Sequence, residues 1–277
     1  MLKKELDKSL IEYNEVLPEK FTLSEDRIPP VHNQHIGTTD YRCMAYATTG
    51  IMRTMWKIYS GEDVNFSEAY VYGKYRKEKD RIGKAMIISD LRPGVINGGA
   101  VPQEAMPDLK KPSEAYDYVQ EHPELDEIAF PYAEMFEGYV NLKGKRKIET
   151  FENIKKALFK YQLPVYGEYI GHAIIFVGWK DNNLYYRDCD GSNWLKTLPY
   201  ENVKEGILFI MNEKKIEIPF VDVTEKHWAY DAIVKAYELG LVKGNEKLEL
   251  TPNNNITKAE VIQMLINLYE KITNEEA

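Results

Sequence analysis

Apolar residues recur at helical spacing in several stretches of the first two thirds of the chain. The longest pattern starts after Asp40, a residue type that caps helices, and ends at Ser60-Gly61. Shorter patterns predict helices at 67–75 and at 151–161, the second of which stops before a proline. The first helix would carry Cys43 in its opening turn, where backbone N–H groups lack partners within the helix.

The middle of the chain becomes β-prone. A continuous run at 173–179 and a second run at 184–188 are separated by a turn, which predicts a hairpin. Such a hairpin brings its outer ends, near His172 and Asp188, to the same edge of the sheet. Residues 206–211 are a further strand candidate.

The last quarter has a different pattern. A charged segment resembling a linker is followed by two helical patterns at 228–240 and 257–269, the second opening with a T-x-x-E capping box. About sixty residues thus form a small all-α unit. We expect two domains, at 1–215 and 216–277.

Composition narrows the class of protein. The 277 residues are 44% hydrophobic and 29% charged, which is ordinary for a folded protein with a core. The formal net charge of −8, from 44 acidic and 36 basic residues, argues against a partner of nucleic acid. No apolar run reaches the roughly 18 to 20 residues of a membrane span, and residues 1–23 have no apolar signal-peptide core.

Cys43 and His172 are the candidate nucleophile and base. A helix N-terminus stabilises a thiolate because its dipole and its N–H groups point at the sulfur. His172 stands directly before the buried-looking strand, and the hairpin returns Asp188 to its side. The remaining histidines have no ligand spacing and are expected to be surface or structural residues: His32, His35, His122 and His227.

The second cysteine leaves an alternative open. Two cysteines permit at most one disulfide, so no disulfide framework is expected. Cys189 lies next to Asp188, and a bridge from Cys189 to Cys43 would abolish catalysis by Cys43.

Several motifs resemble those of the papain-like cysteine peptidases. P-V-H-N-Q at 30–34 precedes C-M-A-Y-A at 43–47, much as P-V-x-x-Q precedes C-W-A-F-A in that family. H-A-I-I-F-V-G-W at 172–179 is similar to the family's H-A-hydrophobic-V-G-aromatic strand. R-D-C-D-G at 187–191 falls where the family has R/K-N-S-W-G. The resemblance runs from about residue 17 to residue 211, and the interval of 129 positions between the cysteine and the histidine agrees with it.

The resemblance implies a fold and a reaction. The fold would be α+β and two-lobed, with Cys43 on a helical lobe and His172 on a β-rich lobe. Cys43 would attack the scissile carbonyl, His172 would carry the proton to the leaving amine, and Asp188 would hold the ring. Gln34 and the Cys43 backbone N–H would form the oxyanion hole. Peptide bonds would be hydrolysed through a thioester, without a metal or an organic cofactor.

Two further positions follow from the same comparison. Gly98-Gly99 falls where the family has a glycine pair lining the substrate cleft, although a simple turn would also explain the pair. Residues 17–21 resemble the mature N-terminus of the family. Because only sixteen residues precede them in this sequence, we expect an enzyme that folds without a large inhibitory propeptide or whose activity needs little restraint.

The chain departs from the family pattern near the site. Gln34 lies nine residues before Cys43, about three more than is usual, and Asp188 replaces an asparagine. Asp190 replaces the tryptophan that follows, so we expect the apolar cover over the orienting bond to come from Trp194. Arg42 replaces a small residue and would either act on the thiol or face water.

Residues 220–272 resemble an S-layer homology domain. The motifs are F-V-D-V, W-A, A-I, two spaced glycines and I-T-K-A-E. Such modules bind anionic secondary cell-wall polymer, which implies a polysaccharide partner, and Lys258 takes the place of the arginine that contacts it. The residues expected to matter are Asp222, Trp228, Lys258 and Glu260. A single copy suggests assembly of three chains or packing on its own peptidase domain, and a structural helical hairpin without wall binding is the alternative.

The leading hypothesis is a cysteine endopeptidase at a Gram-positive cell surface, acting on peptide or protein substrates. Because no export signal is visible in this sequence, the route stays open between non-classical release, release by lysis, as from a phage, a leader that this sequence lacks, and a cytoplasmic location. Two other functions stay open. One is an impaired papain-like protein that acts in binding or assembly, and the other is a thiol amidase acting on cell-wall peptides.

Overall fold

The computed structural model describes residues 3–30, 32–33, 42–76, 86, 88–107, 109, 111–192, 194–212, 218–224 and 226–275. The chain divides into two compact units, residues 1–213 and 214–277, which are described separately. We call them the first unit and the second unit.

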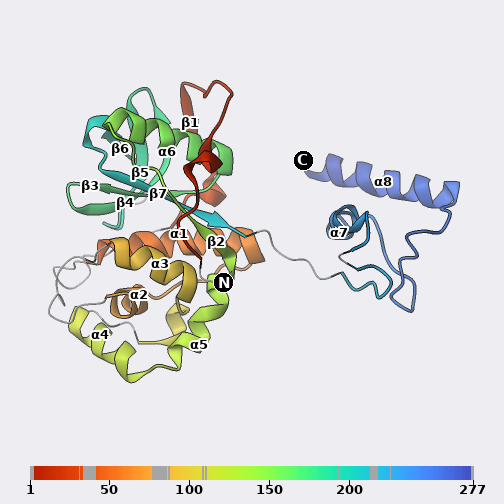
Figure 1. Cartoon of the computed structure of the whole chain (residues 1–277), viewed down its shortest axis with the longest axis horizontal. Coiled ribbons are helices and arrows are strands. Elements are labelled where there is room, and N and C mark those ends of the chain that lie inside the picture. Colours follow the sequence, from red (N-terminus) through yellow and green to blue (C-terminus); the bar gives the residue numbers. More distant parts are fainter. Residues whose placement is uncertain are drawn as a thin grey trace. The chain divides into compact units, whose positions relative to one another are not determined.

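Helices make up one lobe of the first unit, and α1 is the longest of them (Figure 1). Short 3-10 turns lie in the connections between the helices and strands. The helices are α1 (Cys43–Ser60), α2 (Glu68–Lys74), α3 (Ile88–Gly98), α4 (Pro112–Glu121) and α5 (Leu125–Ala129). In the described residues of the first unit, the 3-10 turns are η1 (Lys8–Ile11), η2 (Glu25–Arg27), η4 (Gln103–Ala105), η5 (Phe130–Met135) and η6 (Tyr200–Asn202).

The other lobe is an antiparallel sheet together with helix α6 (Lys147–Tyr161), which packs on it. The strands follow the order β2-β7-β3-β4-β5-β6, and β1 pairs with the far end of β4. Their bounds are β1 (Lys20–Thr22), β2 (Phe136–Asn141), β3 (Val165–Tyr169), β4 (His172–Lys180), β5 (Asn183–Arg187), β6 (Lys196–Pro199) and β7 (Glu205–Met211).

Helix α1 lies between the sheet and the other helices (Figure 1). It packs against β4 and β3, while α6 also contacts the sheet. Ile51, Met52 and Met55 on α1 are fully buried, as is the β4 run from Ala173 to Val177. Because β4 is buried on both faces, it carries a continuous apolar run instead of an alternating pattern.

The predicted helices and the hairpin are present, with different boundaries. Helix α1 begins at Cys43 and not at Asp40, which lies outside the described residues. Ser67 caps α2 by accepting the Tyr70 N–H at 3.1 Å, whereas α6 begins four residues earlier than expected. The early start has a local cause, since the Glu149 carboxylate accepts N–H groups at the helix entrance. In the described part of the chain, no helix has both the length and the apolarity that a membrane crossing requires.

Residues 3–11, the N-terminal strap, connect the two lobes of the first unit. The Lys3 backbone exchanges hydrogen bonds with the Asn97 side chain on α3, at 2.8 and 3.0 Å. The Leu6 N–H donates to the Tyr139 carbonyl on β2 at 2.8 Å, and η1 packs on α6. The strap is therefore part of the folded unit and holds α3 to the sheet.

A substitution at Gly138 tests how much the N-terminal strap contributes to stability. A Cβ at this position of β2 would lie 2.6 Å from the Lys4 carbonyl oxygen and 2.9 Å from the Leu6 side chain. Gly138→Val should therefore displace the strap and lower the free energy of unfolding by about 1–3 kcal/mol, measured by urea denaturation. Glu137→Val, at an exposed neighbouring position, should change it by less than about 0.5 kcal/mol. Equal effects of the two variants would contradict the prediction.

In the described part of the second unit there are two helices, α7 (Tyr230–Glu238) and α8 (Lys258–Glu275), and a small core to which α7 contributes. Phe220, Val223 and Ile233 form that core. The predicted capping box is confirmed, because the Glu260 carboxylate and the Thr257 hydroxyl each accept the other's backbone N–H, at 2.7 and 3.2 Å.

Candidate active site

Cys43 is the first residue of α1 and its side chain is nearly enclosed, with 7% of the residue exposed. Arg42 occupies the N-cap and makes no side-chain capping bond, so it supplies no acceptor to the first N–H groups of the helix. The positive end of the helix dipole therefore points at the Cys43 region. Arg42 itself is buried and donates to the Leu109 carbonyl at 2.8 Å, so its guanidinium does not face water.

A tight turn positions His172 at the start of β4. Ile170 and Gly171 both have left-handed backbones, with φ of 46° and 73°, and His172 pairs with Tyr169 across the turn. Two consecutive left-handed residues are typical of type I′ hairpins, whose twist matches that of the strands. The imidazole is thus carried on a rigid hairpin end.

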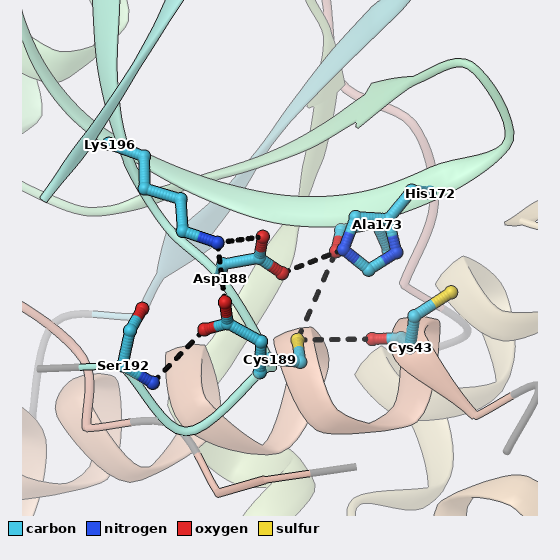
Figure 2. Close-up of polar contacts among 8 residues, drawn as sticks. Cys43, His172, Ala173, Asp188, Cys189, Ser192 and Lys196 are labelled. Carbon is cyan, nitrogen blue, oxygen red and sulfur yellow. Dashed lines mark hydrogen bonds and ion pairs between the residues drawn. The ribbon is translucent and has the colours of Figure 1, made fainter. Parts of the chain in front are cut away.

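Asp188 follows β5 directly and meets the ring from the other side. His172 Nε2 and Asp188 Oδ1 are 2.7 Å apart, and in this bond the ring N–H donates to the carboxylate. The ring also interacts with the Cys43 side chain, which leaves Nδ1 as the nitrogen toward the thiol. Figure 2 shows the imidazole with Asp188 on one side and Cys43 on the other.

Opposing effects set the charge of the His172 ring. Burial lowers its pKa, but hydrogen bonding and charge interactions with Asp188 and Cys43 outweigh burial and raise it from 6.5 to about 9. Burial raises the pKa of Asp188, but His172 and Lys196 outweigh this effect and hold it below its usual value. An imidazolium facing a carboxylate is thus the favoured state at neutral pH.

Lys196 completes the polar cluster, and inspection of the sequence did not single it out. It is the first residue of β6, and its ammonium bonds Asp188 Oδ2 at 2.8 Å and the Asp190 carboxylate (Figure 2). The pKa of Lys196 is raised and that of Asp190 is well below its usual range: burial opposes both shifts, and the ion pairs outweigh it. Two acidic residues two positions apart, Asp188 and Asp190, followed by a lysine in a β-prone run, were the available signal.

The expectation that Trp194 covers the orienting bond is wrong. Trp194 is 67% exposed, and the cluster at Asp188 is closed by the Lys196 side chain instead. The physical reason is that a charged Asp188 needs a cation beside it, whereas an asparagine needs only an apolar cover.

Cys189 does not bridge to Cys43, because both cysteines are free thiols. Cys189 is fully buried, and its thiol faces the carbonyl oxygens of Cys43 at 3.7 Å and of Ala173 at 3.9 Å. Burial raises the Cys189 pKa well above its ordinary value. Cys189 is therefore a neutral packing residue under the start of α1.

Gln34 and His35 lie outside the described residues, so the role of Gln34 at the oxyanion stays a prediction. Gly98-Gly99 lies at the end of α3, where Gly99 has φ of 70° and is buried. A Cβ at Gly98 would meet the Tyr75 hydroxyl at 2.6 Å, and one at Gly99 would meet the Ala129 carbonyl at 2.1 Å. Helix termination and close packing account for both glycines, and the cleft assignment rests on the resemblance alone.

The other histidines among the described residues have hydrogen-bond partners. His32 bonds Glu68 and His122 bonds Glu124, each at 2.7 Å, while His227 Nδ1 accepts the Ala229 N–H. Among the residues described here, no three His, Cys, Asp or Glu side chains converge as metal ligands.

The four predicted residues of the second unit divide into two pairs. The Asp222 carboxylate accepts the N–H groups of Leu250 and Thr251 at 2.8 and 2.7 Å, and Glu260 caps α8, so both have structural roles. Trp228 is 88% exposed and Lys258 is exposed at the start of α8. Asp222 and Glu260 are also exposed, but their carboxylates are engaged by these backbone N–H groups.

Solved structures of cysteine proteases share the fold of the first unit. Digestive procathepsin L 3 of Tenebrio molitor larval midgut superposes with a TM-score of 0.54 and 12% identity, covering 76% of this chain and 74% of that chain. Xylellain from Xylella fastidiosa gives 0.53 and 19%, covering 75% and 90%. The Carica candamarcensis protease CMS1MS2, in complex with E-64, gives 0.51 and 13%, covering 72% and 100%. The first unit therefore has the two-lobed fold of the papain-like cysteine proteases, as the motifs predicted.

Residues 219–262 match the family model of the S-layer homology domain. A curated relative, an endoglucanase of Bacillus sp. (strain KSM-635), is 42% identical over 59 residues, which are 21% of this chain and 6% of the endoglucanase. The chain thus spans only a small fraction of that relative's length. The chain therefore combines a papain-like fold with an S-layer homology domain.

Removing the charge of Asp188 should lower the His172 pKa. Asp188→Asn keeps an oxygen that can accept the ring N–H but deletes the carboxylate, so the pKa should fall from about 9 by roughly one to two pH units. NMR titration of the imidazole measures this, with the resonance assigned by His172→Gln. Asp181→Asn, in the β4–β5 turn, is the control that should leave the value unchanged.

The stabilisation that Asp188 gives through His172 should depend on pH, and Asp188→Asn reveals this dependence. Because folding raises the His172 pKa from 6.5 to about 9, its pairing stabilises the fold fully below about pH 6.5 and loses this effect as pH rises through about 9. The difference in unfolding free energy between wild type and Asp188→Asn should narrow across that window. A constant difference from pH 6 to pH 10 would contradict it.

Proposed function

We propose that the first unit is a cysteine endopeptidase in which Cys43 is the nucleophile and His172 the acid and base. The observation that carries the proposal is the His172 ring, which is bonded at Nε2 to Asp188 and interacts with Cys43 at the start of a helix. A protonated imidazole beside a sulfur at a helix N-terminus favours the thiolate, the reactive form of cysteine.

The reaction follows from these positions. The Cys43 sulfur attacks the carbonyl carbon of the peptide, and the Cys43 backbone N–H supports the developing oxyanion together with Gln34. His172 transfers its proton to the departing amine, which leaves a thioester on Cys43. His172 then takes a proton from a water molecule, whose oxygen attacks the thioester carbonyl. The C–S bond breaks and the acid leaves, which restores the Cys43 thiolate beside the His172 imidazolium. Asp188 keeps the ring oriented throughout.

The activated thiol is tested by chemical labelling. A thiol-directed epoxide should modify Cys43 of the wild-type protein, as located by peptide mass mapping. His172→Ala should slow the modification by about a hundredfold or more, the usual size of a general acid–base contribution. Cys189→Ala is the matched control and should leave the rate at Cys43 unchanged, since the Cys189 thiol is buried and neutral.

The labelling experiment also separates the alternative functions. Modification of Cys43 that does not depend on His172 would overturn the proposal and favour a papain-like protein acting only in binding. His172-dependent labelling with cleavage of cell-wall peptides, and not of protein substrates, would favour the thiol amidase.

We propose further that the second unit tethers the peptidase to secondary cell-wall polysaccharide. The family match at 219–262 supports this, as do the exposed Trp228 ring and Lys258 ammonium. An aromatic face and a cation are suited to a sugar polymer that carries negative charge. A cell-surface location for the protein follows from such a tether.

Binding to purified wall sacculi tests the tether. The full chain should sediment with sacculi, and Trp228→Ala and Lys258→Gln should each weaken retention by about tenfold, a loss of the size of one charged or aromatic contact. Lys247→Gln, also exposed on the second unit, is the control and should bind like wild type. Retention that is unchanged by both substitutions would dismiss these residues as the binding surface.

A further inference from the structure

The two oxygens of Asp188 have different partners. Oδ1 meets His172 Nε2 at 2.7 Å, and Oδ2 meets Lys196 Nζ at 2.8 Å. The backbone fixes the origin of the lysine, because Lys196 pairs with Tyr186 in the β5–β6 ladder. Strand pairing thus places one cation on each side of the carboxylate.

The carboxylate of Asp188 is buried, which strengthens its electrostatic interactions with both partners. The Asp188 side chain is only 8% exposed, so its charge is poorly screened by water. A buried carboxylate with a single partner is costly, and it would act with its full charge on that partner. Asp190 holds the ammonium from a second direction, and Asp190 is itself fixed by the Ser192 N–H at 3.0 Å.

We propose that Lys196 is a positioning residue of the active site. Its ammonium fixes Asp188 in the orientation that faces His172, and it neutralises part of the carboxylate charge so that the ring can give up its proton during the reaction. The inference rests on the proposed peptidase function. In the papain-like family an asparagine orients the histidine and a tryptophan covers the bond between them. Here Lys196 takes the place of that apolar cover, because the orienting residue Asp188 is charged.

Other charged or titratable groups in the described part of the chain surround this cluster and bear on its titration. They are Tyr169 on β3, Tyr186 and Arg187 on β5, Cys43 on α1, and Cys189 and Asp190 in the loop after β5. Burial raises the pKa of Tyr186, so its phenol stays uncharged near neutral pH. Lys196 is the cation that bonds directly to Asp188 Oδ2.

The test is a double-mutant cycle read by NMR. Lys196→Met keeps the aliphatic stem but removes the ammonium, so Asp188 acts more strongly on the ring and the His172 pKa should rise above about 9. In the Asp188→Asn background the same substitution should raise the pKa less, because the carboxylate that transmits the effect is gone. Lys196→Arg should restore the wild-type value, and Lys180→Met, at the exposed end of β4, is the matched control.

Turnover is a second readout. Lys196→Met should lower kcat on a peptide substrate by about tenfold or more with little change in KM. The substitution impedes proton release from the His172 ring but leaves substrate binding unchanged. Lys196→Arg should recover most of the rate.

The outcomes are distinguishable. An equal rise of the His172 pKa in both backgrounds, or no rise in either, would overturn the role of Lys196 even in an active enzyme. If His172 has no effect on Cys43 labelling, the peptidase proposal fails, while the NMR cycle still decides whether Lys196 acts on the ring through Asp188.

Discussion

The hydrogen bond between His172 and Asp188 is the interaction on which the candidate site depends. It forms because β4 and β5 are adjacent antiparallel strands, so the residue that opens one lies beside the residue that follows the other. The bond occupies Nε2 and thereby leaves Nδ1 for Cys43, which comes from the opposite lobe on α1. Packing of α1 on β3 and β4 fixes the position of the helical lobe relative to the sheet. The sheet, the helix and the turn thus serve a geometry that involves three side chains.

The main elements of this geometry can be predicted from local sequence. The apolar run of β4, its turn and β5 specify the hairpin, and the long apolar face of α1 specifies the helix that begins at Cys43. Lys196 could not be predicted in the same way, because its role depends on the pairing of β6 with β5 and on where a flexible side chain finds two carboxylates. The expected cover by Trp194 was wrong for the same reason, since motif order does not indicate which neighbour neutralises a buried charge.

The two buried cysteines differ in their surroundings. Cys43 lies at the start of a helix and beside an imidazole, whereas Cys189 is enclosed and its thiol faces the backbone carbonyl groups of Cys43 and Ala173. The same environment that raises the Cys189 pKa keeps it unreactive. In the second unit a comparable division applies, because Asp222 and Glu260 are used by the fold while Trp228 and Lys258 remain available at the surface.

The turn before His172 has an energetic consequence. Ile170 is β-branched yet has a left-handed backbone, a conformation that costs a non-glycine residue about 1–2 kcal/mol. The surrounding hairpin meets that cost when the chain folds, and the backbone beside the imidazole has already lost its conformational freedom. Little entropy then remains to be lost at this position when a ligand arrives, so the ring is preorganised at the expense of global stability.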